Sequence, residues 1–214
     1  IKGTEQAAMI ERAGKRIQAA VEKYMADNGA SSQLNGFNWE FKLIKDDNTI
    51  NAWCMPGGKV AFYSGILPIC LDETGVAVVM GHEIAHAIAN HGGERMSQGM
   101  LQQLGMSSLS VALGQNPTMT NQLLLQSIGM GSQIGMLSFS RQHESEADII
   151  GLIFSSMAGY DPREAPEFWK RMKAASGGQA PPEFLSTHPS SDRRINDLNA
   201  QLPEAIKIYD QYKR

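Results

Sequence analysis

The sequence lacks most features that would place it outside the ordinary globular class. It contains only two cysteines, Cys54 and Cys70, and their spacing is not that of a C-x-x-C zinc or redox motif. A disulfide between them and two separate buried thiols both remain open. No uninterrupted apolar run reaches 18 residues, so we expect no transmembrane segment. The chain has no dense lysine and arginine run and a formal net charge of −3, so we expect no nucleic-acid partner.

What is present describes a globular protein of moderate size. The chain has 214 residues, of which 42% are hydrophobic and 19% are charged. We therefore predict a single domain over residues 1–214. Because the sequence begins with Ile1 and not with methionine, we expect that a preceding segment has been removed.

The most informative stretch, residues 75–91, predicts one buried helix because it is apolar nearly all round. It contains the pattern H-E-x-x-H from His82 to His86. Residues four apart share one helix face, so these two imidazoles can hold one Zn²⁺ ion. Glu83 lies about 100° round the helix from His82, where its carboxylate suits a general base acting on water. The alternative is a chance match, with both histidines satisfied in a core without a metal.

We expect the helix to be capped by Asp72 or Thr74 and to end at Gly92–Gly93. His91 follows His86 by five residues, about 140° round the helix, so it cannot share the metal. We expect it at the helix C-terminus, where the helix dipole favours a cationic side chain.

A catalytic zinc site usually has three protein ligands, so a third must come from elsewhere. The metzincin pattern needs a histidine at position 92, where this chain has Gly92. Glu144 and Asp148 lie four apart on a predicted helix over residues 139–158 and share a face. The first can be the ligand, and the second can accept a hydrogen bond from a ligand histidine. Glu146 points elsewhere and is the weaker candidate; a solvated acidic face is the alternative for the pair.

The remaining pattern predicts an α+β protein that is mostly helical, with about three short strands. The segment over residues 94–136 is rich in Met, Gly, Gln and Ser, and we expect it to be a helical cover that moves to admit substrate; a loosely packed helical hairpin is the alternative. The other expected helices cover residues 4–27, 64–71 and 161–175, and a final helix or pair of helices, broken near Pro203, follows Arg194. The expected strands cover residues 37–44, 50–54 and 59–63, the last two as an antiparallel hairpin.

Taken together, the motifs resemble a known family. H-E-I-A-H is followed some sixty residues later by S-R-x-x-E-x-E-A-D-x-x-G, then by Gly159-Tyr-Asp-Pro162 and Thr187-His188-Pro189. Asn51-Ala52 and Pro56-Gly57-Gly58 precede the helix. This combination is similar to the gluzincin metallopeptidases of the HtpX and CaaX-prenyl-protease type, and is nearest to their soluble, extracytoplasmic bacterial members.

The resemblance implies a zincin-like fold with a small antiparallel-rich sheet beside the His-bearing helix. It implies one zinc ion per chain at His82, His86 and Glu144, with Glu83 as the base. It also gives roles to His188 and Arg194, six positions apart. Either could stabilise the oxyanion of the tetrahedral intermediate, or His188 could occupy the fourth zinc position until substrate displaces it.

The implied activity is peptide hydrolysis in unfolded or flexible protein segments, as in protein quality control. In zincins an edge strand beside the helix pairs with the substrate backbone, and the strand expected here consists of Lys59, Val60, Ala61, Phe62 and Tyr63. A non-catalytic, zinc-stabilised chaperone-like or peptide-binding module is the alternative function, and a small-molecule hydrolase is a third. The expected location is periplasmic or otherwise extracytoplasmic, which is compatible with peripheral membrane association.

Overall fold

The computed structural model describes residues 3–114, 140–177 and 182–213. The chain forms two compact units, residues 1–89 with 145–214, and residues 90–144. The single domain over residues 1–214 and the cover over residues 94–136 remain predictions. Residues 115–136 of that cover lie outside the described residues.

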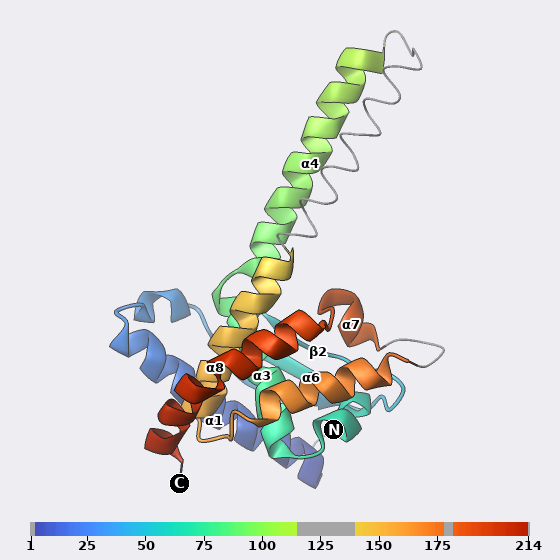
Figure 1. The fold of residues 1–214 in the computed structure, drawn as a ribbon. Coiled ribbons are helices and arrows are strands. Elements are labelled where there is room, and N and C mark those ends of the chain that lie inside the picture. Colours follow the sequence, from blue (N-terminus) through green and yellow to red (C-terminus); the bar gives the residue numbers. More distant parts are fainter. Residues whose placement is uncertain (1–2, 115–139, 178–181, 214) are drawn as a thin grey trace. The chain divides into compact units, whose positions relative to one another are not determined.

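The first helix, α1, spans Glu5–Asp27, which agrees with the expected helix over residues 4–27 (Figure 1). The Thr4 hydroxyl accepts a hydrogen bond from the Ala7 N–H at 3.2 Å, which satisfies one of the unpaired donors at a helix start. A one-turn 3₁₀ helix, Ser31–Leu34, follows. The buried face of α1 consists of Ile10, Ala13, Gly14, Ile17, Ala20, Val21 and Met25.

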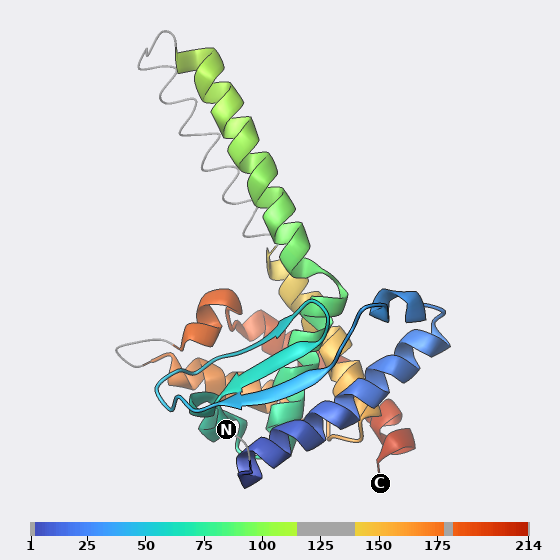
Figure 2. The same cartoon turned by 180° about the vertical axis from the view of Figure 1, so that it is seen from behind.

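A three-stranded sheet follows, made of β1 Glu40–Ile44, β2 Ala52–Met55 and β3 Lys59–Tyr63 (Figure 2). Its order is β1-β3-β2, with β1 parallel and β2 antiparallel to β3. The expected hairpin is confirmed. Gly57 and Gly58 turn the chain between its strands with φ of 88° and 83°, a region that glycine adopts readily.

The expectation that β3 forms an edge strand is wrong. Strand β3 pairs with β1 on one side and with β2 on the other, so it has no side on which to add a substrate strand. The order of the strands in the sequence could not show this. Strand β2 lies between β1 and β3 in the sequence, yet β1 pairs directly with β3, in parallel. The edge strand that packs against the His-bearing helix is β2.

The His-bearing helix, α3, spans Glu73–Ile88 and is shorter than expected. Asp72 caps its start by accepting hydrogen bonds from two backbone N–H groups at 2.8 and 3.1 Å. Its end was predicted wrongly: the chain turns at Asn90, which has a left-handed φ of 56°, and helix α4 begins at His91. Gly92 and Gly93 therefore lie inside α4, which spans His91–Gly114, and His91 lies in the first turn of α4 rather than at the end of α3.

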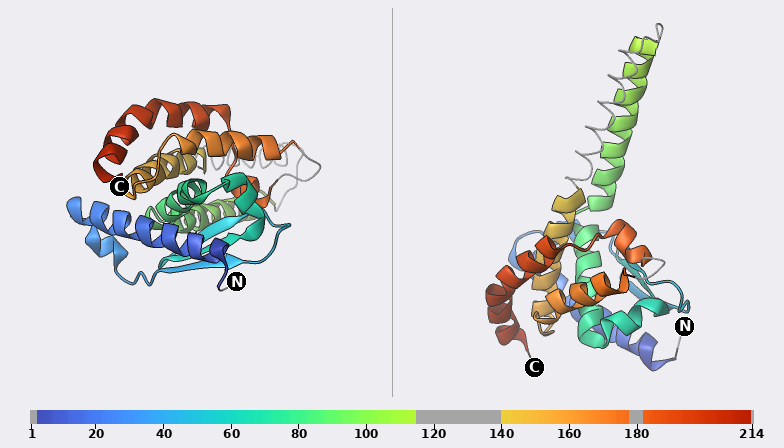
Figure 3. Two further views of the ribbon diagram at one scale, coloured as in Figure 1. Left: turned by 90° about the horizontal axis from the view of Figure 1, so that it is seen from below. Right: turned by 45° about the vertical axis from the view of Figure 1, so that its right-hand side comes forward.

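Within the first unit, α3 is the central element. The sheet and α1 pack on one side of it, and α6 packs on the other, followed by α8 (Figure 3). Helix α6 begins at Glu164, later than expected, because Asp161 accepts the Arg163 N–H at 3.0 Å in a turn before it.

Helix α8 continues through Pro203 without a break. The remaining elements are η2 Ser64–Ile66, α2 Leu67–Cys70, the helix over residues 140–157, α6 Glu164–Ala175, α7 Glu183–Thr187 and α8 Asp192–Tyr212. The mostly helical α+β class with a small three-stranded sheet is confirmed.

The two cysteines are separate free thiols. Cys70 is fully buried, and burial also raises the pKa of the Cys54 thiol to about 12. Within the described ranges no single helix has the length and apolar composition needed to cross a membrane, although the bent pair Ser64–Cys70 with Glu73–Ile88 passes that test on length and composition alone.

Candidate metal centre

Two glycines bring α3 and the helix over residues 140–157 into close contact. A Cβ atom added to Gly81 would lie 2.7 Å from the Gly151 carbonyl oxygen, and one added to Gly151 would lie 2.7 Å from the His82 backbone nitrogen. Side-chain carbons do not fit at such distances from backbone atoms, so this approach requires glycine at both positions. The contact lies directly at His82 and sets how close the 140–157 helix comes to the histidine.

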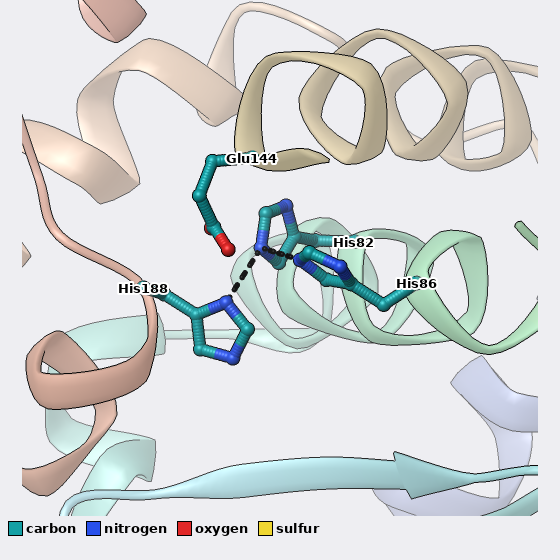
Figure 4. Close-up of side chains that lie close together, drawn as sticks. All are labelled: His82, His86, Glu144 and His188. Atoms are coloured by element: carbon teal, nitrogen blue, oxygen red, sulfur yellow. Dashed lines mark hydrogen bonds between the residues drawn. The ribbon is translucent and has the colours of Figure 1, made fainter. Parts of the chain in front are cut away.

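Four side chains meet beside this contact. One ligand-type atom from each of His82, His86, Glu144 and His188 lies within 4.8 Å of the other three (Figure 4). The His82 Nε2 atom is 3.1 Å from His86 Nε2 and 3.2 Å from His188 Nδ1. Glu144 is the last residue of the second unit, on the helix that continues through Ser145 into the first. The structure thus brings together the three predicted metal ligands and His188.

The chemistry of this group fits zinc. Three imidazoles and a carboxylate are the ligand types that Zn²⁺ prefers, and tetrahedral ligands at about 2.0–2.1 Å would lie roughly 3.3 Å from one another. The imidazole distances of 3.1 and 3.2 Å are close to that spacing. All four side chains are buried to 9% exposure or less, where a cluster of polar groups is costly without a common partner.

Asp148 orients His82 as the sequence spacing suggests. Its Oδ1 atom lies 3.1 Å from His82 Nδ1, on the side of the ring opposite the nitrogen that faces the cluster. Burial raises the pKa of Asp148, but hydrogen bonds and ion pairing with Arg194 outweigh burial and hold that pKa below its ordinary value. An ionised Asp148 at this distance favours a proton on His82 Nδ1, which leaves His82 Nε2 as the atom able to bind a metal.

Arg194 contacts Asp148 instead of facing the cluster. Its Nε and Nη2 atoms donate to the two Asp148 oxygens at 2.6 and 2.7 Å, and Nη1 donates to the Pro189 carbonyl at 2.9 Å. The guanidinium also lies 3.9 Å from the centre of the Trp169 ring, which packs edge-on against His82. The predicted oxyanion contact of Arg194 remains a prediction, but this geometry favours a positioning role.

Glu83 and His188 face each other across the site. The Glu83 Oε1 atom is 3.3 Å from His188 Nε2, while the other His188 nitrogen faces His82. Glu83 is 4% exposed. Its carboxylate thus lies next to the cluster without belonging to the four-residue group, as expected of a base placed one residue after a ligand.

No motif or spacing pointed to two neighbours of the site, Trp169 and Arg95. Arg95 Nη2 donates to Glu144 Oε1 at 3.0 Å, yet the two residues are 49 positions apart. His91 and Glu146 lie outside the four-residue group found in the described part of the chain. The His91 ring stacks on His143 with a centroid distance of 4.1 Å.

Comparison with known proteins assigns the chain to a family. The model of peptidase family M48 matches residues 11–202. The chain belongs to peptidase family M48. This family depends on zinc, and the His/His/Glu/His group of the M48 chain is suited to hold it.

Named relatives of this M48 chain include mitochondrial metalloendopeptidase OMA1 from Saccharomyces cerevisiae, 38% identical over 92% of the chain and 56% of that protein. Human OMA1 is 34% identical over 82% of the chain and 34% of its own length. The beta-barrel assembly-enhancing protease of Escherichia coli is 32% identical over 81% and 37%. The chain thus spans about half or less of these relatives.

These relatives overturn the expected location. The relatives that are 34–40% identical to this M48 chain are named as mitochondrial proteins, so the expected periplasmic or otherwise extracytoplasmic location is contradicted. The expected soluble bacterial branch is likewise not confirmed. Motif resemblance identified the family correctly, but the motif residues carry no information about the compartment.

Proposed function

We propose that this M48 chain is a zinc-dependent endopeptidase that cleaves unfolded or flexible protein segments. The observation that supports the proposal is the buried group of His82, His86, Glu144 and His188, with the Glu83 carboxylate beside it. A structural zinc site needs no additional acidic group next to its ligands, whereas a hydrolytic site needs a base.

In this mechanism His82, His86 and Glu144 hold the zinc. The ion, when bound, supplies a Lewis acid that polarises a peptide carbonyl and makes water more acidic. Glu83 removes a proton from the attacking water and transfers it to the leaving amine. Asp148 keeps the proton of His82 on Nδ1, and Arg194 holds Asp148 in place.

His188 occupies the cluster in the resting arrangement. One of its ring nitrogens faces His82 Nε2 at 3.2 Å and the other faces Glu83 Oε1 at 3.3 Å. Both the fourth coordination position and the base are thereby engaged before substrate arrives. We therefore assign His188 to the fourth position, from which a substrate displaces it, in preference to the oxyanion role.

The edge strand β2 takes the substrate-binding role that was expected of β3. The Tyr63 N–H donates to the Asn51 carbonyl at 3.0 Å, so Asn51 and Tyr63 form a hydrogen-bonded pair of the β2–β3 ladder. Along an antiparallel ladder, hydrogen-bonded residue pairs alternate with pairs that are not hydrogen-bonded. Cys54 lies opposite Val60, three positions along the ladder, so this pair is not hydrogen-bonded. The backbone N–H and C=O of Cys54 therefore point away from β3. These groups can pair with an extended peptide.

Recognition through backbone groups reads little side-chain sequence, so we expect broad specificity limited to segments that can become extended. Folded proteins seldom offer such segments. This selectivity suits the removal of damaged or misassembled proteins, and one related protein is named a beta-barrel assembly-enhancing protease.

The decisive experiment measures zinc content together with cleavage of an unfolded protein such as casein. We expect about one zinc per chain, cleavage that stops with a chelator, and recovery when zinc is restored. Glu83→Gln is the matched control: it should keep the zinc and lose about 10²–10⁴-fold in rate, the usual contribution of a general base. Zinc binding without cleavage by the unaltered chain would instead favour a zinc-stabilised peptide-binding module.

A further inference from the structure

Two carboxylates on one helix are each bound by an arginine, but in different ways. Arg194 donates to both oxygens of Asp148, at 2.6 and 2.7 Å. Arg95 donates through Nη2 to one oxygen of Glu144, Oε1, at 3.0 Å. A two-point arginine contact occupies both carboxylate oxygens, whereas a one-point contact uses only one of them. Both arginines thus hold a buried carboxylate at the candidate metal centre, since Asp148 and Glu144 are 6% and 2% exposed.

The residue before Arg95 contacts the residue before Glu144. Glu94, the preceding residue of α4, has its Oε2 atom 2.9 Å from His143 Nε2. The His143 ring stacks on His91 in the first turn of α4 with an interplanar angle of 9°. Both histidines are buried, at 4% and 2% exposure. Glu94 and Arg95 thus contact His143 and Glu144 as two consecutive pairs.

We propose that Arg95 is a positioning residue that fixes the Glu144 carboxylate for the metal. This inference rests on the proposed metal site. Glu144 is 2% exposed, and loss of the Arg95 hydrogen bond would let its carboxylate sample other rotamers at the cost of metal affinity. Hydrogen-bonding partners of metal ligands typically change metal affinity by about 10–100-fold when removed.

The test compares four forms of the full chain: the unaltered protein, Arg95→Met, Arg95→Lys and Arg141→Met. Arg141 is the matched control because it is an exposed arginine on the same helix, three residues before Glu144. Zinc affinity is measured by competition with a chromophoric chelator, and the metal environment by the visible spectrum of the Co²⁺-substituted protein. Neither measurement depends on activity.

We expect Arg95→Met to raise the zinc Kd about 10–100-fold and to alter the cobalt spectrum. Arg95→Lys keeps a charged donor and should recover most of the affinity, and Arg141→Met should match the unaltered chain. A folded Arg95→Met protein with unchanged zinc Kd and cobalt spectrum overturns the proposal.

Should Arg95→Met fail to fold, Arg95→Gln takes its place: it keeps a polar side chain but loses the charge and the reach of the guanidinium, and its zinc Kd should rise by a smaller factor. An unchanged Kd in that variant overturns the proposal in the same way. Failure of the unaltered chain to bind zinc would instead overturn the proposed metal site itself, so the two failures are distinguishable.

Discussion

The Arg194 guanidinium donates two hydrogen bonds to the Asp148 carboxylate, at 2.6 and 2.7 Å. Both side chains are buried, at 6% and 5% exposure. Asp148 lies in turn 3.1 Å from His82 Nδ1. Residues on three helices, α8, α3 and the helix over residues 140–157, are thereby joined in one polar chain. The orientation of a candidate metal ligand thus depends on an arginine that acts on it through Asp148.

Replacing Arg194 by methionine should therefore affect both stability and metal binding. Removing one partner of a buried ion pair costs about 3–5 kcal/mol, because the other charge is left buried without compensation. We expect a large fall in the free energy of unfolding, measured by denaturant titration, and about 10–100-fold weaker zinc binding. Arg193→Met is the control, since that neighbouring side chain is 77% exposed. Equal effects of the two changes would contradict this account.

The same pair predicts a pH dependence. Arg194 holds the pKa of Asp148 below its ordinary value, so the pair adds stability above the unfolded-state pKa and loses it as pH falls through the lowered value. Without Arg194, burial alone would raise that pKa. The stability difference between the unaltered chain and Arg194→Met should then be largest near neutral pH and shrink in acid. A difference that stays constant from neutral pH to about pH 3 would show that Asp148 is not its source.

The glycine contact beside His82 gives a further prediction. In Gly151→Ala the new Cβ would lie 2.7 Å from the His82 backbone nitrogen, and the backbone cannot move aside by a rotamer change. We expect a loss of about 1–3 kcal/mol in the free energy of unfolding, with weaker zinc binding as the helices separate. Gly99→Ala is the matched control: Gly99 also lies in a helix, but its added Cβ meets nothing within 4 Å. Wild-type zinc affinity in Gly151→Ala would show that this close contact does not set the site.

The parts of the site that are local in sequence were predictable. The spacing of His82 and His86, and of Glu144 and Asp148, follows from helix periodicity, so the residues on each shared face could be read directly. The contacts between distant elements could not. The central place of β3 depends on its parallel pairing with β1, and the partner of Arg194 depends on the way α8 packs.

The end of α3 shows a different limit. The glycines at positions 92 and 93 suggested a helix end there, but the chain turns earlier, at Asn90, a residue that tolerates the left-handed conformation. Glycine is also accepted inside a helix, as it is in α4, so its presence alone does not fix a boundary. Motif resemblance, in contrast, identified the correct family over nearly the whole chain.

His188 supplies another prediction. If it occupies the fourth position and engages Glu83, then His188→Ala should keep about one zinc per chain and cleave a short peptide faster. A competing interaction of about 1.4 kcal/mol corresponds to a tenfold change in rate. Ser186→Ala, an exposed change in the same segment, should leave the rate unchanged. A fall in kcat with unchanged zinc content would assign His188 to oxyanion stabilisation instead and contradict the resting arrangement.

Strand β2 supplies the last prediction, because its role in substrate binding depends on one backbone N–H. The Cys54 N–H points away from β3, so Cys54→Pro removes a donor from the open edge and leaves the β2–β3 ladder intact. One backbone hydrogen bond is worth about 0.5–1.5 kcal/mol, so kcat/KM for an unfolded protein should fall about 2- to 12-fold. Cys54→Ala removes the thiol but keeps the N–H, and it should cleave normally. Zinc Kd should be unchanged in both variants. Equal losses in the two would trace the effect to the side chain, and equal activity with the unaltered chain would remove β2 from the substrate path.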